Sequence, residues 1–142
     1  MMTHGEAKNI DVEEAIKVID ASDKTFITSL LLASGLRASK MGFEYVKSAI
    51  PIYKMFNGNM ELICEVLGKL YAIRKTAAGR DMRTAIFEAA ERGWFRSFND
   101  LVGYEILSGD EKKMKAKDYL AIMAQCVESK RIRNILLGEN KD

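Results

Sequence analysis

The 142-residue chain has one histidine, one proline and two cysteines, and each shortage excludes a class of protein. Because His4 is the only imidazole, we expect neither a cluster of histidine metal ligands nor a Ser-His-Asp triad. Cys64 and Cys126 lie far apart without a CxxC pair, so we expect two buried free thiols. No glycine-rich phosphate-binding motif occurs. The sequence therefore predicts no enzyme, with no catalytic residue, no metal and no cofactor.

Long apolar runs and a secretory leader are also missing. The longest apolar stretches, such as residues 27–36, are interrupted by Thr and Ser and stay below the roughly 18 residues of a membrane span. Residues 1–11 lack a basic region followed by an apolar block. We therefore expect a cytoplasmic protein with no membrane partner.

Apolar residues are plentiful and recur mainly three and four positions apart. They make up 48% of the chain and charged residues 30%, which is typical of one folded domain. The spacing predicts an all-α fold, a compact bundle of six to seven helices containing a helix-turn-helix. The expected helices cover residues 11–22, 25–34, 38–50, 60–70, 76–92, 97–107 and 118–137. Pro51 either kinks the third helix or opens a further turn, and the basic stretch 112–117 introduces the last helix.

Positive charge is concentrated in the middle of the chain. Residues 69–96 carry seven basic and three acidic groups, whereas the net charge of the whole chain is only +2. A basic stripe on one helix pair is the electrostatic pattern expected of a phosphate-binding surface. A solvated face with no partner is the alternative.

The fifth predicted helix separates into two faces when its residues are placed 100° apart. The side predicted to pack inward holds Ala78, Met82, Ala85, Ile86 and Ala89. The opposite side holds Thr76, Arg80, Thr84, Phe87 and Glu91, with Arg83 beside them. Phe87 would either meet a thymine methyl or pack on the sixth helix, and we favour packing.

Arginine suits a guanine edge because it forms two parallel hydrogen bonds, and a helix fits the major groove. Residues 67–74 are the expected supporting helix of the helix-turn-helix, although the strict pattern with a turn glycine is not met. Groove insertion should use the N-terminal half of the fifth helix, because Glu88 and Glu91 oppose phosphate at its far end. The predicted DNA-binding residues are Arg74, Lys75, Thr76, Arg80, Arg83, Thr84 and Arg96, with Arg74, Lys75 and Arg96 assigned to phosphates.

A resemblance to a known family covers about residues 26–128. The spacing of Gly35, Ala38, Gly42, Tyr45 and Ala49-Ile50 resembles the opening of the C-terminal effector domain of the sporulation master response regulator, stage zero sporulation protein A. Later blocks are similar too: Glu65-Val66-Leu67, Ala85-Ile86, Arg92-Gly93, residues 101–106 and residues 119–124. The resemblance implies an all-helical transcription regulator whose helix-turn-helix reads duplex DNA in the major groove.

The register of the recognition helix stays open in this comparison. The chain is about four residues shorter than the family pattern between Asn57 and Gly103. A loss near Asn57 aligns Arg80 and Arg83 with family arginines, whereas a loss after Arg96 aligns Ala85-Ile86 and Trp94 instead. In both registers Arg80 and Arg83 project outward.

The domain layout follows from the resemblance. Residues 1–25 are the expected N-terminal tail and first helix, residues 26–137 the effector-like DNA-binding domain, and residues 138–142 a C-terminal tail. Too few residues precede the domain for a phosphorylated receiver, so we expect no phosphoryl switch. The expected partner is double-stranded DNA, with RNA polymerase and a second copy on DNA as further candidates. The alternative is a non-catalytic helical protein-interaction module with a degenerate DNA-binding face.

Overall fold

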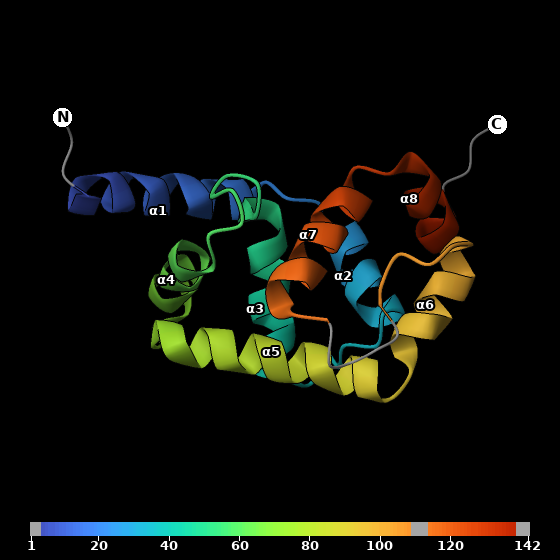
Figure 1. Ribbon diagram of the computed structural model, residues 1–142. Helices are drawn as coiled ribbons and strands as arrows, with labels where there is room; N and C mark the ends of the chain where they lie inside the picture. The colour runs from blue at the N-terminus through green and yellow to red at the C-terminus, as the bar shows by residue number, and fades with distance from the viewer. Residues whose placement is uncertain (1–3, 109–113, 139–142) are drawn as a thin grey trace.

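The computed structural model describes the backbone of residues 4–108 and 114–138 and the side chains of residues 12–108 and 114–138. These residues form eight α-helices and no strand (Figure 1). The helices are α1 (His4–Asp20), α2 (Lys24–Ala33), α3 (Met41–Ile52), α4 (Met60–Tyr71), α5 (Lys75–Glu91), α6 (Trp94–Val102), α7 (Ala116–Val127) and α8 (Lys130–Leu137). The predicted all-α class is confirmed, but the predicted count of six to seven helices is wrong for the described residues.

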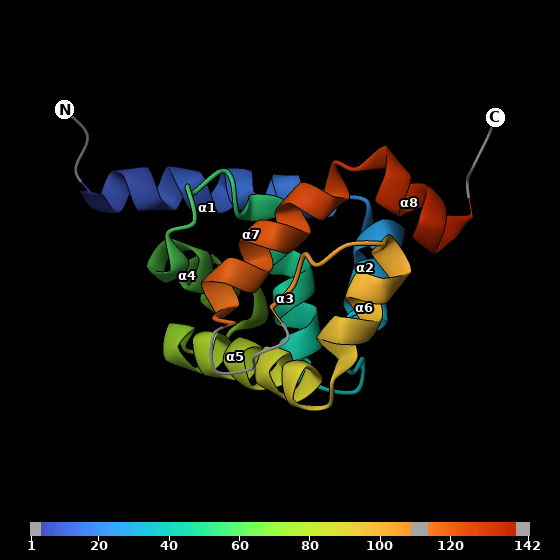
Figure 2. The same cartoon turned by 45° about the vertical axis from the view of Figure 1, so that its right-hand side comes forward.

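Helix α3 is the centre of the arrangement. It contacts α1, α2, α4, α5 and α7, and in both views it lies between α1 on one side and α5 on the other (Figures 1 and 2). Its apolar and small residues are buried almost around the whole helix, from Gly42 to Ile52. A helix buried on most sides is typical of a core element, because it has no solvated stripe.

The first helices differ from the prediction at their ends. Helix α1 begins at His4 and not at residue 11, because Glu6 and its neighbours Ala7 and Lys8 are good helix formers that extend the first turns. The side chains of His4 and Asp11 lie outside the described ones. Helix α3 begins at Met41 and not at residue 38, and it continues through Pro51 to Ile52, so the proline lies inside its last turn.

The predicted sixth helix ends earlier than expected. Helix α6 covers Trp94–Val102 and not residues 97–107, because Gly103 takes a left-handed conformation (φ 95°) as its C-cap. The Asn99 side chain then holds the returning chain: its amide oxygen accepts from the N–H groups of Ile106 and Leu107, and its amide nitrogen donates to the Leu107 carbonyl. Gly109 of the predicted break at Ser108-Gly109, and residues 112 and 113 of the basic stretch, lie outside the described residues.

The predicted last helix, residues 118–137, is two helices. Helix α7 ends at Val127, and the Ser129 hydroxyl accepts a hydrogen bond from the N–H of Ile132 (3.1 Å) as the N-cap of α8. A serine side chain that accepts a backbone hydrogen bond as an N-cap competes with the backbone hydrogen bonds that would continue the preceding helix. The chain therefore turns at Glu128-Ser129, and α8 packs against α2 and α6.

The core also contains two polar side chains that form a hydrogen bond with each other. The hydroxyl groups of Ser34 and Tyr119 are buried and lie 2.6 Å apart, which joins the end of α2 to α7. Burial raises the pKa of Tyr119 well above its usual value, against a smaller lowering by the hydrogen bond to Ser34. Cys64 and Cys126 are both free and buried, so that prediction is confirmed.

Candidate nucleic-acid interface

Helices α4 and α5 pack against each other and are joined by three residues, Ala72, Ile73 and Arg74. Ala72 adopts the left-handed conformation (φ 56°, ψ 48°) that glycine usually supplies, and its N–H donates to the Gly68 carbonyl. The N–H of Ile73 donates to the same carbonyl at 2.9 Å. The missing turn glycine, which made the sequence pattern weak, is therefore replaced by a strained alanine. The bounds predicted for the supporting helix, residues 67–74, were wrong: α4 covers Met60–Tyr71, so that segment starts inside α4 and runs into the turn.

Gly42 fixes the distance between α3 and α5. A Cβ atom at Gly42 would lie 2.4 Å from the Asp81 carbonyl oxygen and 2.9 Å from the Ala85 Cβ atom. Real Cβ atoms do not approach this closely, so only glycine permits this crossing. Because Gly42 has no side chain, α5 can lie this close to the central helix α3.

The two predicted faces of α5 are confirmed. Ala78, Met82, Ala85, Ile86 and Ala89 are all buried. Thr76, Arg80, Arg83, Thr84, Phe87 and Glu91 are exposed. Phe87 is 46% exposed, so it is not covered by the sixth helix as we expected.

Positive charge gathers at the N-terminal end of α5. Arg74 is the N-cap residue, without a capping side-chain hydrogen bond, and no acidic residue occupies the first turn. Because a helix N-terminus already carries partial positive charge, cations there add to an uncompensated positive potential. Lys75 contacts Glu61 of α4, with Nζ and Oε2 3.7 Å apart, and the two side chains are 46% and 66% exposed. This pair is weak and leaves Lys75 available to an anion.

The two outward arginines differ in their surroundings. The Arg80 Nε atom lies 3.4 Å from Oδ1 of its neighbour Asp81, at an exposed position. Arg83 forms no ion pair with another residue of the described part, and its guanidinium folds back over Gly79. Arg83 is therefore the freer of the two for a bidentate contact.

Arg96 is separated from the other predicted residues. It is the third residue of α6, exposed, and lies beyond the C-terminal end of α5, a helix of 17 residues or roughly 26 Å. The nearby Arg92 side chain donates to the Gly35 carbonyl at 3.0 Å. The structure thus brings together six of the seven predicted residues, Arg74, Lys75, Thr76, Arg80, Arg83 and Thr84, and places Arg96 at the opposite end of the helix.

Sequence reasoning missed Lys115 and Lys117 as members of this surface. They stand at the start of α7 and share one hollow with Arg83 and Phe87. The basic stretch 112–117 was the available signal, but spacing along the chain cannot show that Lys115 and Lys117 share a hollow with residues of α5. This part of α7 adds two cations to the surface.

No protein-family model, curated protein or solved structure matches this chain. Within the described residues, no group of three or more His, Cys, Asp or Glu side chains is placed to hold a metal ion. In that same part of the chain, no helix has the length and apolar character needed to cross a membrane.

Proposed function

We propose that this chain is a non-catalytic, sequence-specific double-stranded DNA-binding transcription regulator. The N-terminal half of α5 enters the major groove, where Arg80, Arg83 and the threonines beside them contact base edges. Arg74, Lys75 and, at the far end of α5, Arg96 contact phosphates. The proposal includes a helix-turn-helix built from α4, the three-residue turn and α5.

One observation carries the proposal: the exposed face of α5 is basic at the end where the helix itself is positive. Such an arrangement costs the free protein stability, because like charges are held near a positive helix end. A phosphate backbone would relieve that repulsion. The inward face of the same helix is fully apolar, so α5 is held as a rigid reading element.

The resemblance to the sporulation regulator's effector domain extends the proposal. It suggests a regulator that acts without its own phosphoryl switch, in the cytoplasm, with RNA polymerase or a second copy on DNA as further partners. None of these partners is needed for the first test.

Binding to DNA is tested by fluorescence anisotropy of a labelled duplex of random sequence. We expect a dissociation constant in the micromolar range or tighter at low salt. The affinity should fall steeply as the salt concentration rises, because phosphate contacts release counterions. Lys75→Ala should reduce the slope of log affinity against log salt by about one. The control is Lys17→Ala, which removes the same charge from α1, across the molecule from α5 (Figure 1). No binding to any duplex at low salt would exclude the proposal.

A second candidate function is supported by the exposed apolar side chains of α6. Trp94 and Leu101 are 44% and 49% exposed, and seven residues apart they lie on one side of the helix. Exposed large apolar groups on one face are typical of protein-interaction surfaces. An interaction module would bind DNA weakly or not at all, without the steep dependence on salt.

A further inference from the structure

A hollow of about 400 Å³ opens between α4, α5 and the start of α7. Its lining is largely apolar and includes Met60 and Cys64 from α4, Phe87 from α5, and Met114 just before α7. The volume lies within the range of small-molecule sites, and methionine side chains adapt to ligands of different shape. Gly79 lines the hollow as well, and its missing side chain is part of the space.

Among the residues that the structure describes, the charged groups that line this hollow are all positive. They are Arg83, Lys115 and Lys117. None of these three cations forms an ion pair with another residue that the structure describes. An apolar lining beside three cations is complementary to a molecule that combines a hydrocarbon body with one negative group.

Two further features support an anion at this place. Helix α7 starts at the edge of the hollow, and its N-cap residue Lys115 makes no capping side-chain hydrogen bond, while Asp118 is the acidic residue of its first turn. Burial raises the pKa of the Cys64 thiol, while the charges of Arg83 and Lys75 act to lower it. The positive potential therefore reaches the floor of the hollow.

We propose that the hollow binds a small amphiphilic organic anion, an aliphatic or aromatic body carrying one carboxylate or sulfonate group. The body packs against Met60, Phe87 and Met114, and the charged group meets Arg83 and the lysines at the start of α7. This assignment does not depend on DNA binding.

A regulatory consequence rests on the proposed function. Arg83 belongs both to the hollow and to the face of α5 that would enter the groove. An anion that engages Arg83 removes it from DNA, so the two ligands compete, and the coupling must be equal in both directions. The hollow would then be the effector site of the regulator.

Direct binding is measured on the full chain without DNA. The probes are anilinonaphthalene sulfonate, by its fluorescence, and decanoate, by displacement of that probe. We expect saturable binding of one probe molecule, a tenfold or larger loss of affinity in Lys115→Glu/Lys117→Glu, and displacement by decanoate. Both lysines are exposed, so this variant should fold, which circular dichroism verifies.

Matched variants separate this hollow from other apolar surface. Lys17→Glu/Lys130→Glu, on α1 and α8, makes the same double charge change elsewhere and should leave the affinity unchanged. Gly79→Leu fills the hollow from α5 and should abolish binding while the helix content is kept. Equal affinities in all three variants, or no saturable binding to the wild type, would overturn the proposal.

Competition is measured separately by adding decanoate to the labelled DNA complex. We expect the DNA affinity to fall at least threefold at a saturating concentration of decanoate, and not to fall in Gly79→Leu. Unchanged DNA affinity in the wild type would overturn the regulatory consequence. Absence of DNA binding would exclude the proposed function and the competition with it, whereas the anion titration would still decide the site.

Discussion

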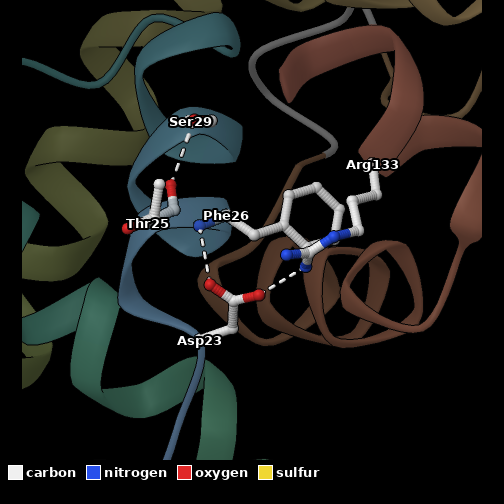
Figure 3. Close-up of polar contacts among 5 residues, drawn as sticks. All are labelled: Asp23, Thr25, Phe26, Ser29 and Arg133. Carbon is white, nitrogen blue, oxygen red and sulfur yellow. Dashed lines mark hydrogen bonds and ion pairs between the residues drawn. The ribbon is translucent and has the colours of Figure 1, made fainter. Parts of the chain in front are cut away.

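Asp23 and Arg133 lie 110 residues apart in the sequence and form an ion pair that joins the start of α2 to α8 (Figure 3). The other Asp23 oxygen accepts from the Phe26 N–H at 3.2 Å and caps α2. The Arg133 guanidinium also lies over the Phe26 ring, with its Cζ atom 5.3 Å from the ring centroid. One carboxylate therefore serves both a local and a long-range contact.

The two roles of Asp23 can be separated by substitution. Asparagine caps helices as well as aspartate does, so Asp23→Asn should lose only the ion pair, worth at most about 1 kcal/mol at this half-exposed position. Asp23→Ala should cost about 1 kcal/mol more, because the cap is lost as well. Urea unfolding of both variants measures the difference. Equal costs would mean that the cap contributes nothing.

The same carboxylate gives the fold a dependence on pH. The hydrogen bond from Arg133, followed by that from the Phe26 N–H, lowers the pKa of Asp23 below its usual 3.8, against a smaller opposing contribution of burial. A lowered pKa stabilises the folded state above the unfolded pKa, and this contribution is lost as pH falls through the folded pKa. The stability difference between wild type and Asp23→Asn should therefore shrink below about pH 3.8. A difference that stays constant on acidification would contradict the ion pair's role.

The crossing of α3 and α5 predicts opposite effects for one substitution at two glycines. Gly42→Ala should destabilise the protein by about 1–3 kcal/mol, because the new methyl group collides with the Asp81 carbonyl. Gly79→Ala, inside α5, should be stabilising by about 0.5–1 kcal/mol, since its Cβ atom lies 3.4 Å or more from its neighbours. Thermal unfolding of the pair measures both signs. A neutral Gly42→Ala would show that α5 is not held by this contact.

The left-handed conformation of Ala72, in the turn before α5, predicts that glycine at this position stabilises the protein. Ala72→Gly should raise the free energy of unfolding by up to about 1 kcal/mol, because glycine adopts the left-handed conformation without strain. Ala121→Gly inside α7 is the control and should lower it by about 1 kcal/mol. If both changes destabilised equally, Ala72 would not hold a left-handed backbone in solution.

The outward arginines predict a difference between base and phosphate contacts. Arg83→Ala or Arg80→Ala should cost about 1–3 kcal/mol on a selected site and relax selectivity at one base pair. Lys75→Ala should weaken all sequences alike. Affinities on the selected and a scrambled duplex at matched salt measure this. Uniform losses from all three variants would place α5 along the backbone and not in the groove.

The preferred sequence is the last prediction. The inward face of α5 can pack on the core in either register. The fold can therefore persist while the residues that contact bases differ from those of the sporulation regulator. We expect a preference for another sequence than that regulator's own site, each mismatched pair costing about 1–3 kcal/mol. A tenfold or larger preference for the regulator's site would favour the register that aligns Arg80 and Arg83 with family arginines.

Periodicity along the chain was sufficient to predict the all-α class and the two faces of α5, but not the division of residues 118–137 into α7 and α8. A helix turns by a fixed angle per residue, so spacing alone separates Met82 and Ile86, which are buried, from Arg80 and Arg83, which are not. The helix ends were predicted less well, because they depend on single side chains such as Ser129 and Asn99 whose partners lie several residues away.

The sequence by itself determined that the chain is helical, where its core residues lie and which helix carries exposed arginines, because these follow from local spacing and composition. Only the tertiary structure decided that Lys115 and Lys117 stand beside Arg83 while Arg96 stands at the other end of α5. It also decided that Gly42 sets the crossing of α3 and α5 and that a hollow opens beside Phe87. These features depend on distances between segments far apart in the chain, and side-chain contacts between packed helices fix those distances.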